Sequence, residues 1–310
     1  MIGESIALLV AVLWTTGALF GELASKRLGA LPLNVIRMVL SLLMLGTALW
    51  FLVGHPYPYL ADGETWLWMT LSGLMGFGFG DYCLFNSYNL IGSRFSQLFM
   101  TLASPFAAIT AWLMLGEQMT LLGILGMSIT IIGIGMSVLS KAPTKEQHHL
   151  TVKLPAKGVV FGIGAAIGQG VGLVLSKVGL EHYTATAPLE EVTSIFAYPV
   201  GGTMIRALAG LACFLLLLVL KGKTQRLVTA VHDGRGMTFA LLATFLGPAL
   251  GVSLSLLALQ YTEAGVAQTI MSLVPILIIW PSRLIFKTKV TALEVVGAII
   301  AVLGVTLFFI

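Results

Sequence analysis

One carboxylate lies inside an otherwise apolar segment of this chain. Four glycines, at positions 73, 76, 78 and 80, lead directly into Asp81. An ionised carboxylate at the centre of a bilayer costs about 2.5–3.5 kcal/mol on insertion scales, so we expect Asp81 to face water or a polar partner. Two roles stay open for it. It could bind a cation or a proton, or it could bond to backbone groups or a facing polar side chain and serve the structure.

A second group of charges could form pairs or gates. Glu22 and Lys26 are four residues apart near the end of an apolar segment, so they can pair on one face of a helix. We expect a surface pair there, with a gating contact as the alternative. Lys177 and Arg206 lie in or beside later apolar segments and could bind an anionic group. Such residues more often extend to lipid headgroups or pair with loop acids such as Glu181. We expect this of Arg206, and for Lys177 both roles stay open.

Several aromatic and amide side chains also lie within apolar segments. Amide groups in lipid need partners, so they either join helices by hydrogen bonds or line a polar cavity. The candidates for a binding cavity, beside Asp81, are Trp14, Tyr82, Asn86, Gln97, Gln169, Gln260 and Gln268. For each of them the structural role stays open as well.

Motifs for metals and nucleotides do not occur in the sequence. All five histidines fall in loops or linkers, and no His-Glu-x-x-His pair occurs, which argues against a metalloprotease. No Gly-x-x-x-x-Gly-Lys loop is present, so we do not expect the chain to hydrolyse ATP itself. We therefore predict no catalytic residue, metal or cofactor.

The composition is that of an integral membrane protein. The 310 residues are 57% hydrophobic and only 10% charged, whereas soluble domains carry roughly a quarter charged residues. The net charge of +4 does not indicate nucleic-acid binding, because the basic residues sit in short loops between apolar runs.

The chain divides into apolar segments long enough to cross a bilayer, which takes about 20 residues. We expect an all-α protein with ten transmembrane helices at 5–24, 33–53, 66–90, 94–115, 119–140, 157–180, 202–220, 237–261, 265–286 and 290–310. A turn at Ile91–Ser93 separates the third from the fourth. The polar stretch 141–156 divides a first five-helix repeat, 1–140, from a second, 157–310.

The two halves resemble each other in order and spacing. Both contain Gln-x-x-Met-Thr/Ser-Leu followed by a proline, and both end in a segment with two glycines at the same offset. The matching positions are 97–102 with 268–273, Pro105 with Pro275, 34–37 with 203–206, and Gly126 and Gly133 with Gly297 and Gly304. We expect the prolines to kink their helices and the glycines to allow close packing, as in the series Gly164, Gly168 and Gly172.

Each half has an odd number of helices, so the second repeat must be inverted relative to the first. The basic residues support this, because cytoplasmic loops are enriched in Lys and Arg. Of the 17 basic residues, all but Lys177 and Arg206 fall in or beside loops on one side, with Arg37 counted there as a residue at the start of its helix. We therefore expect loop 141–156 in the cytoplasm and both termini outside.

These features resemble the EamA type of the drug/metabolite transporter superfamily. The residues that carry the resemblance are Gly80-Asp81, Ser96-Gln97, Met100-Thr101-Leu102, Pro105 and Leu115-Gly116-Glu117. Two departures stand out: the second repeat has Ile285-Phe286-Lys287 where the first has Leu-Gly-Glu, and the loop after helix 6 is longer and more acidic than its counterpart. The resemblance implies a basket in which helices 1–4 and 6–9 line a central cavity while helices 5 and 10 brace it.

We accordingly expect a secondary transporter in the cytoplasmic membrane, working by alternating access with a site between the repeats. Its substrate would be a small metabolite such as an amino acid or a related compound, with export as the expected direction. Expected partners are membrane lipids and protons as a coupling ion, with no nucleic acid, in a monomer or homodimer. A lipid-carrier flippase is the main alternative, and a membrane-embedded enzyme is the lesser one.

Overall fold

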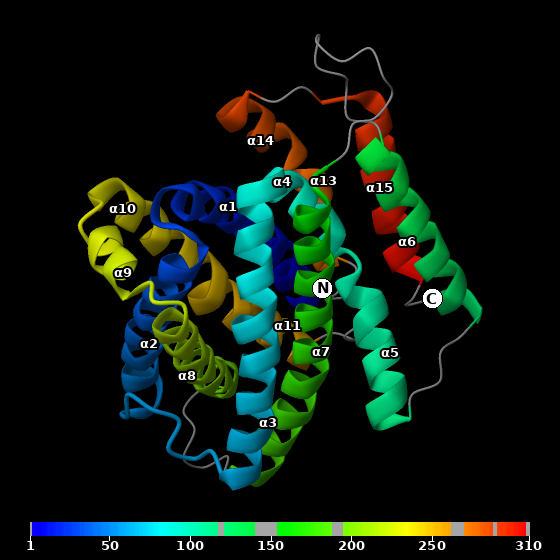
Figure 1. Ribbon diagram of the computed structural model, residues 1–310. Helices are drawn as coiled ribbons and strands as arrows, with labels where there is room; N and C mark the ends of the chain where they lie inside the picture. Colours follow the sequence, from blue (N-terminus) through cyan, green and yellow to red (C-terminus); the bar gives the residue numbers. More distant parts are fainter. Residues whose placement is uncertain are drawn as a thin grey trace.

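The protein is described from a computed structural model that covers residues 2–116, 121–139, 154–187, 195–261, 270–287 and 290–307. Within these ranges the regular structure is entirely helical (Figure 1). The first half contains α1 (Ile2–Leu28), α2 (Ala30–Val53), α3 (Gly63–Gly73), η1 (Leu74–Asp81), α4 (Tyr82–Met100), α5 (Ala103–Leu115) and α6 (Leu121–Leu139).

The second half repeats this plan with more interruptions. It contains α7 (Ala156–Thr186), α8 (Ala197–Leu220), α9 (Thr224–Val231), α10 (Gly234–Thr244), η3 (Phe245–Val252), α11 (Ser253–Tyr261), α13 (Val274–Leu277), α14 (Ile279–Phe286) and α15 (Ala292–Thr306). The elements named η are π-helical.

Helices cover most of the described part of each predicted segment, with breaks at 101–102 and 272–273. Five of them are long and apolar enough to cross a membrane unaided: Ile2–Leu28, Ala30–Val53, Ala156–Thr186, Ala197–Leu220 and Gly234–Ala258. Gly63–Met100 and Ala103–Met114 qualify together as a pair bent by 49°. The prediction of an all-helical membrane protein is thus confirmed, while the count of ten crossings stays a prediction.

Glycine separates the third predicted helix from the fourth. The run named α4 is broken at Gly92, which has φ 80° and ψ 161°. Gly29, between α1 and α2, has nearly the same conformation, with φ 85° and ψ 151°. This region of backbone space is essentially closed to residues with a Cβ atom. The break confirms the turn expected at Ile91–Ser93.

The irregular parts of the helices recur at one register in both halves. The π-helix Leu74–Asp81 matches Phe245–Val252, and the break at 101–102 matches the break at 272–273. This is the register of the match between 97–102 and 268–273. The breaks lie a few residues before the predicted kinks at Pro105 and Pro275, because a proline lacks an N–H group and its ring clashes with the carbonyl one turn earlier.

The pair α6 and α15 stands beside the rest of the bundle (Figure 1). A Cβ added to Gly133 would lie 2.3 Å from the nitrogen of Ala301, and one added to Gly297 would lie 2.5 Å from the nitrogen of Ser137. Only glycine permits backbones this close. The close packing predicted for these glycines is therefore confirmed, and neither helix contributes to the cavities described below.

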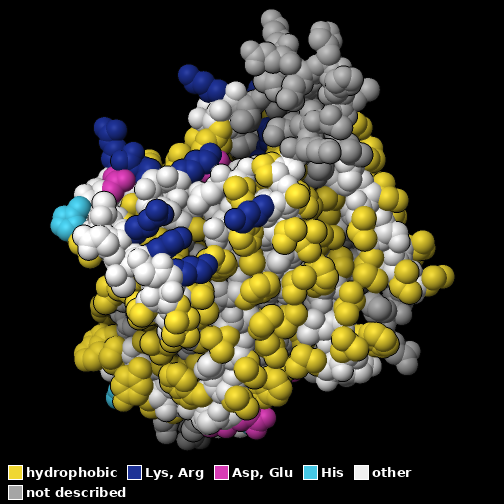
Figure 2. Space-filling model, viewed as in Figure 1, with side chains coloured by type: hydrophobic (Ala, Val, Ile, Leu, Met, Phe, Trp, Pro, Cys, Tyr) yellow, Lys and Arg dark blue, Asp and Glu magenta, His cyan; other side chains and the backbone are white. Residues whose placement is uncertain are grey.

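The charged side chains are unevenly distributed on the surface. In Figure 2 the Lys and Arg side chains gather over the upper part of the visible face, above a broad apolar surface. A bilayer requires such an apolar band.

Candidate functional site

Asp81 is buried at the end of η1, where two side chains bond to its carboxylate. Only 4% of the residue is exposed. The Arg37 guanidinium lies 2.9 Å from Oδ2, and the Gln169 amide donates to Oδ1 at 3.0 Å. Arg37 also donates to the Asn34 side chain at 3.1 Å. The first half thus supplies a buried ion pair, and the second half, through α7, supplies a neutral donor.

The position of Arg37 differs from the expectation. The sequence placed it at the start of a helix beside a cytoplasmic loop, but α2 begins at Ala30, so Arg37 lies about two turns inside the helix. It is 6% exposed and stacks on Phe85, with the guanidinium 4.4 Å from the ring centroid. The physical reason is its pairing with Asp81, since burying a charge without an opposite one is costly.

Close packing of glycines brings Gln169 to Asp81. A Cβ added to Gly168 would lie 2.6 Å from Cα of Gly80, and one added to Gly172 would lie 3.0 Å from Cα of Gly76. The predicted flat face of α7 therefore rests on the glycine run of η1. A larger residue at these contacts would move α7 outward and take the amide away from the carboxylate.

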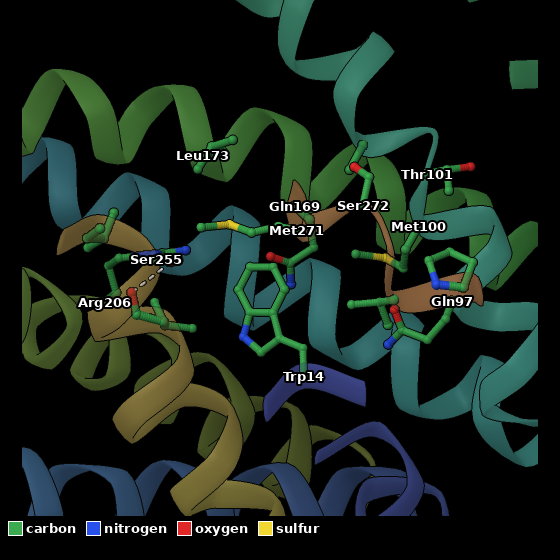
Figure 3. A pocket seen from close by; sticks show the side chains of 15 residues that line it. Trp14, Gln97, Met100, Thr101, Gln169, Leu173, Arg206, Ser255, Met271 and Ser272 are labelled. Carbon is green, nitrogen blue, oxygen red and sulfur yellow. Dashed lines mark hydrogen bonds between the residues drawn. The ribbon is translucent and has the colours of Figure 1, made fainter. Parts of the chain in front are cut away.

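Two cavities meet at this cluster. The first, of about 120 Å³, is lined by Arg37 and Asp81 and is called here the Arg37 cavity. The second, of about 110 Å³, is lined by Arg206 and is called the Arg206 cavity (Figure 3). Both share the lining residues Trp14, Gln97, Met100, Gln169 and Val252. In Figure 3 the indole of Trp14 lies between Arg206 with Ser255 on one side and Gln97 on the other.

The structure brings together four of the predicted cavity residues, namely Trp14, Asp81, Gln97 and Gln169. Gln97 donates to the hydroxyl of Tyr88 at 2.6 Å, which orients its amide at the cavity wall. That any of these residues binds a substrate stays a prediction.

Two other candidates are found away from both cavities. The hydroxyl of Tyr82 bonds to the Lys221 ammonium, and its ring packs edge-on against Phe161. Asn86 donates to the backbone carbonyl of Tyr82 at 2.7 Å, within its own helix. Neither lines the Arg37 cavity or the Arg206 cavity. The side chain of Gln260 and the whole of Gln268 lie outside the described residues.

Arg206 is buried, which corrects the expectation that it reaches headgroups or loop acids. It is 5% exposed, and its guanidinium lies 4.9 Å from the ring centroid of Phe77. The helix α8 begins at Ala197, earlier than predicted, and this places Arg206 well inside the bundle. The Asp81 carboxylate attracts it there. Lys177 is half-buried on α7 and lines neither cavity.

The pair of Glu22 and Lys26 forms as predicted, but only one member is at the surface. Lys26 is exposed, whereas Glu22 is 3% exposed, so the expected surface pair is wrong for the carboxylate. The other oxygen of Glu22 accepts a hydrogen bond from the Ser93 N–H at 2.6 Å. Glu22 therefore secures the helix that starts after Gly92, because the first N–H groups of a helix lack partners within it.

Sequence reasoning missed the central role of Arg37. The signal was present in the match of 34–37 with 203–206, which makes Arg37 and Arg206 equivalent positions of the two halves. Groups of His, Cys, Asp or Glu that could hold a metal do not occur among the residues that the structure describes.

The helices are apolar, and their π-helical turns and breaks recur in both halves. Buried charges lie beside interior cavities. These features define an integral membrane protein with a polar interior. Comparison with known families is consistent with this class. The chain belongs to the EamA-like transporter family, whose model matches residues 1–139 and 156–310. It is therefore a multi-pass membrane transporter of the drug/metabolite type, in a family of transporters rather than enzymes.

Known structures show the same fold. One, described as "Crystal structure of protein", aligns over 98% of this chain and 95% of its own, with a TM-score of 0.54 and 14% sequence identity. At this identity the likeness concerns the fold alone. No curated protein matches the chain in sequence.

Proposed function

We propose that this protein is a secondary transporter that exports a small metabolite, such as an amino acid or a related compound, across the cytoplasmic membrane. The observation that carries the proposal is the buried cluster of Arg37, Asp81 and Gln169 at the wall of the Arg37 cavity, with Gln169 also lining the Arg206 cavity. A carboxylate held by one donor from each half can respond to movement between the halves. A purely structural bundle would gain more from apolar packing at this place.

The arrangement of the cavities favours alternating access. The residues that both cavities share form a common wall, and Trp14, Gln97 and Gln169 supply its polar and aromatic surface. A substrate site at this wall would open to one side of the membrane when the helices around the Arg37 cavity separate. It would open to the other side when the helices around the Arg206 cavity separate. Inverted repeats of five helices would make these two movements equivalent.

Protons are the coupling ion that we propose, with Asp81 as the group that exchanges them. We also propose that the basic surface faces the cytoplasm, because cytoplasmic loops are enriched in Lys and Arg. Both termini then lie outside. If a pH gradient leaves the flux unchanged, the proposed proton coupling is wrong, but the proposal of transport stands.

The test is flux in liposomes containing the purified full-length protein. Amino acids and related compounds are loaded inside, and their exit is followed with and without a pH gradient. We expect saturable flux of at least one compound above that of protein-free liposomes. The proposal is overturned if folded protein moves none of them.

A matched pair of amide variants tests the site. Gln97→Ala removes a polar group from the shared wall and is expected to lower the flux by up to about tenfold, the value of one hydrogen bond. Gln225→Ala removes the same amide from the exposed helix α9 and is expected to leave the flux unchanged. Equal fluxes in both variants would place the substrate elsewhere.

A further inference from the structure

The guanidinium of Arg206 is a buried cation to which no described residue is bonded. Its Nε is fully buried without a hydrogen-bond partner, and the side chain forms no ion pair among the described residues. The ring of Phe77 covers one side at 4.9 Å. A Cβ at Gly76 would lie 2.9 Å from Nη2, so the guanidinium packs directly against the glycine and would have to shift if this residue had a side chain. The remaining side faces the Arg206 cavity.

The equivalent arginine of the first half has the partner that Arg206 lacks. Arg37 pairs with Asp81, whereas the position of the second half that matches Asp81 in the repeat register is Val252. Arg37, Asp81 and Arg206 are the only charged residues among those that line the two cavities. With Asp81 bonded to Arg37 and Gln169, the cluster retains one positive charge, and it is at Arg206.

The rest of the Arg206 cavity suits the body of a small organic molecule. Much of the wall of this cavity is apolar or aromatic, with Trp14, Leu173, Leu256 and Met271 among its residues. Neutral polar groups line it as well, namely the amides of Gln97 and Gln169 and the hydroxyls of Thr101, Ser255 and Ser272. The Ser255 hydroxyl donates to the carbonyl of Val252 at 2.8 Å, so toward the cavity it can only accept. Arg206 is the one charged donor among the residues that line this cavity, and its planar fork matches a carboxylate.

We propose that Arg206 binds the carboxylate of the transported substrate, which is a small organic acid with an apolar or aromatic body. This inference rests on the proposed transport function and names its substrate class. The carboxylate would neutralise the remaining charge of the cluster, while Trp14 and Met271 would pack against the body of the substrate. An ammonium group on the substrate is not required, because both oxygens of Asp81 already have donors.

The first test compares acids with their neutral amides on the full-length protein in lipid nanodiscs at constant ionic strength. The probes are phenylacetate with phenylacetamide and hexanoate with hexanamide. We expect the acids to raise the unfolding temperature by mass action and the amides to have little effect. Sodium phosphate at the same concentration controls for a general effect of anions. Amides that stabilise as well as the acids, or phosphate that replaces them, would overturn the proposal.

The second test changes the arginine. We expect Arg206→Gln to weaken binding of the acids by about tenfold or more, since a charge-assisted hydrogen bond is lost, and Arg206→Lys to weaken it less. Arg226→Gln, an exposed arginine of α9, is the matched control and should bind the acids as wild type does. If Arg206→Gln does not fold, the lysine variant decides. Binding by Arg206→Lys that equals wild type for both acids and amides would overturn the proposal.

Flux measurements separate this inference from the transport proposal. If the wild type exports a neutral or cationic compound equally well with Arg206→Gln, transport stands and the anion site is wrong. If the acids bind through Arg206 but no compound is moved, the anion site stands and the transport proposal is wrong.

Discussion

Three of the buried charges, Arg37, Asp81 and Arg206, line the two cavities and differ in their partners. Arg37 and Asp81 are 2.9 Å apart, while Arg206 has only aromatic and long-range electrostatic contacts among the described residues. A buried ion pair adds little net stability compared with apolar residues, but removing one partner is costly because the other charge stays buried. The pair therefore acts mainly to hold the carboxylate in one place, beside Gln169.

We expect the coupling between Arg37 and Asp81 to be large. Asp81→Asn and Arg37→Gln are each expected to lower the free energy of unfolding by about 3–5 kcal/mol, because each leaves a buried group uncompensated. The double variant should lose less than the sum, since the two side chains interact directly. Reversible unfolding in mixed micelles measures all three. The matched control is the exposed pair Arg27 and Asp233, joined at 2.8 Å, whose coupling water should largely screen. Additive losses at Arg37 and Asp81 would refute the pairing.

At the scale of elements, the contact between α7 and η1 determines whether the site forms. The π-helix widens the turn before Asp81. Its glycines pack against the glycines of α7 so closely that the two backbones are in contact. A π-helix within an α-helix is uncommon and often marks a functional place. Here the same irregularity occurs in η3, where the side chain of Trp14 fills the space beside Gly251.

Gly168→Ala is expected to be destabilising. The added methyl group would lie 2.6 Å from Cα of Gly80, and such overpacking typically costs about 1–3 kcal/mol. The variant should also transport less, because Gln169 would move away from Asp81. Gly135→Ala on α6 is the control, since outside its own helix turn no described atom lies within 4 Å of the added Cβ. Thermal unfolding and flux of both variants test this, and equal stability would contradict the close contact.

At the scale of the whole molecule, polar contacts join the two halves near the ends of several helices. Arg27 pairs with Asp233 at the start of α10, and Arg94 of α4 pairs with Glu294 of α15 at 2.7 Å. Hydrogen bonds from Arg27 hold the pKa of Asp233 below its ordinary value, so this contact persists to lower pH than an unpaired carboxylate would allow. Movement between the halves would have to break or reposition these contacts.

The topology predicted from the basic residues can be tested by labelling single cysteines. Gln225→Cys lies on α9 among basic residues, and His55→Cys lies in the loop after α2; both positions are exposed. In a background with Cys83 and Cys213 replaced, a membrane-impermeant reagent should label position 55 in intact cells and position 225 only after permeabilisation. The reverse pattern would show that the termini face the cytoplasm.

Much of the architecture could be predicted because it depends on local chemistry. Apolar runs of sufficient length, Gly92 at a break and the paired glycines of α6 and α15 are properties of short stretches, and the repeat made their positions more certain. Asp81 stood out for a similar reason, since a single charge in an apolar segment is costly wherever it lies. The matched residues 1–139 and 156–310 place both halves in the same family.

The partners of that charge could not be predicted, and they depend on distance in three dimensions. Arg37 and Gln169 lie 44 and 88 residues from Asp81 in sequence, and no local pattern connects them. Arg37 and Arg206, whose positions were predicted wrongly, lie on helices that begin earlier than their apolar runs suggest. A shift of a few residues moves a side chain from the membrane interface to the interior of the bundle. The sequence by itself thus determined a repeated helical membrane protein with a charge in its interior. Only the tertiary packing of glycine against glycine decided that Asp81 is shared between Arg37 and Gln169 while Arg206 faces a cavity.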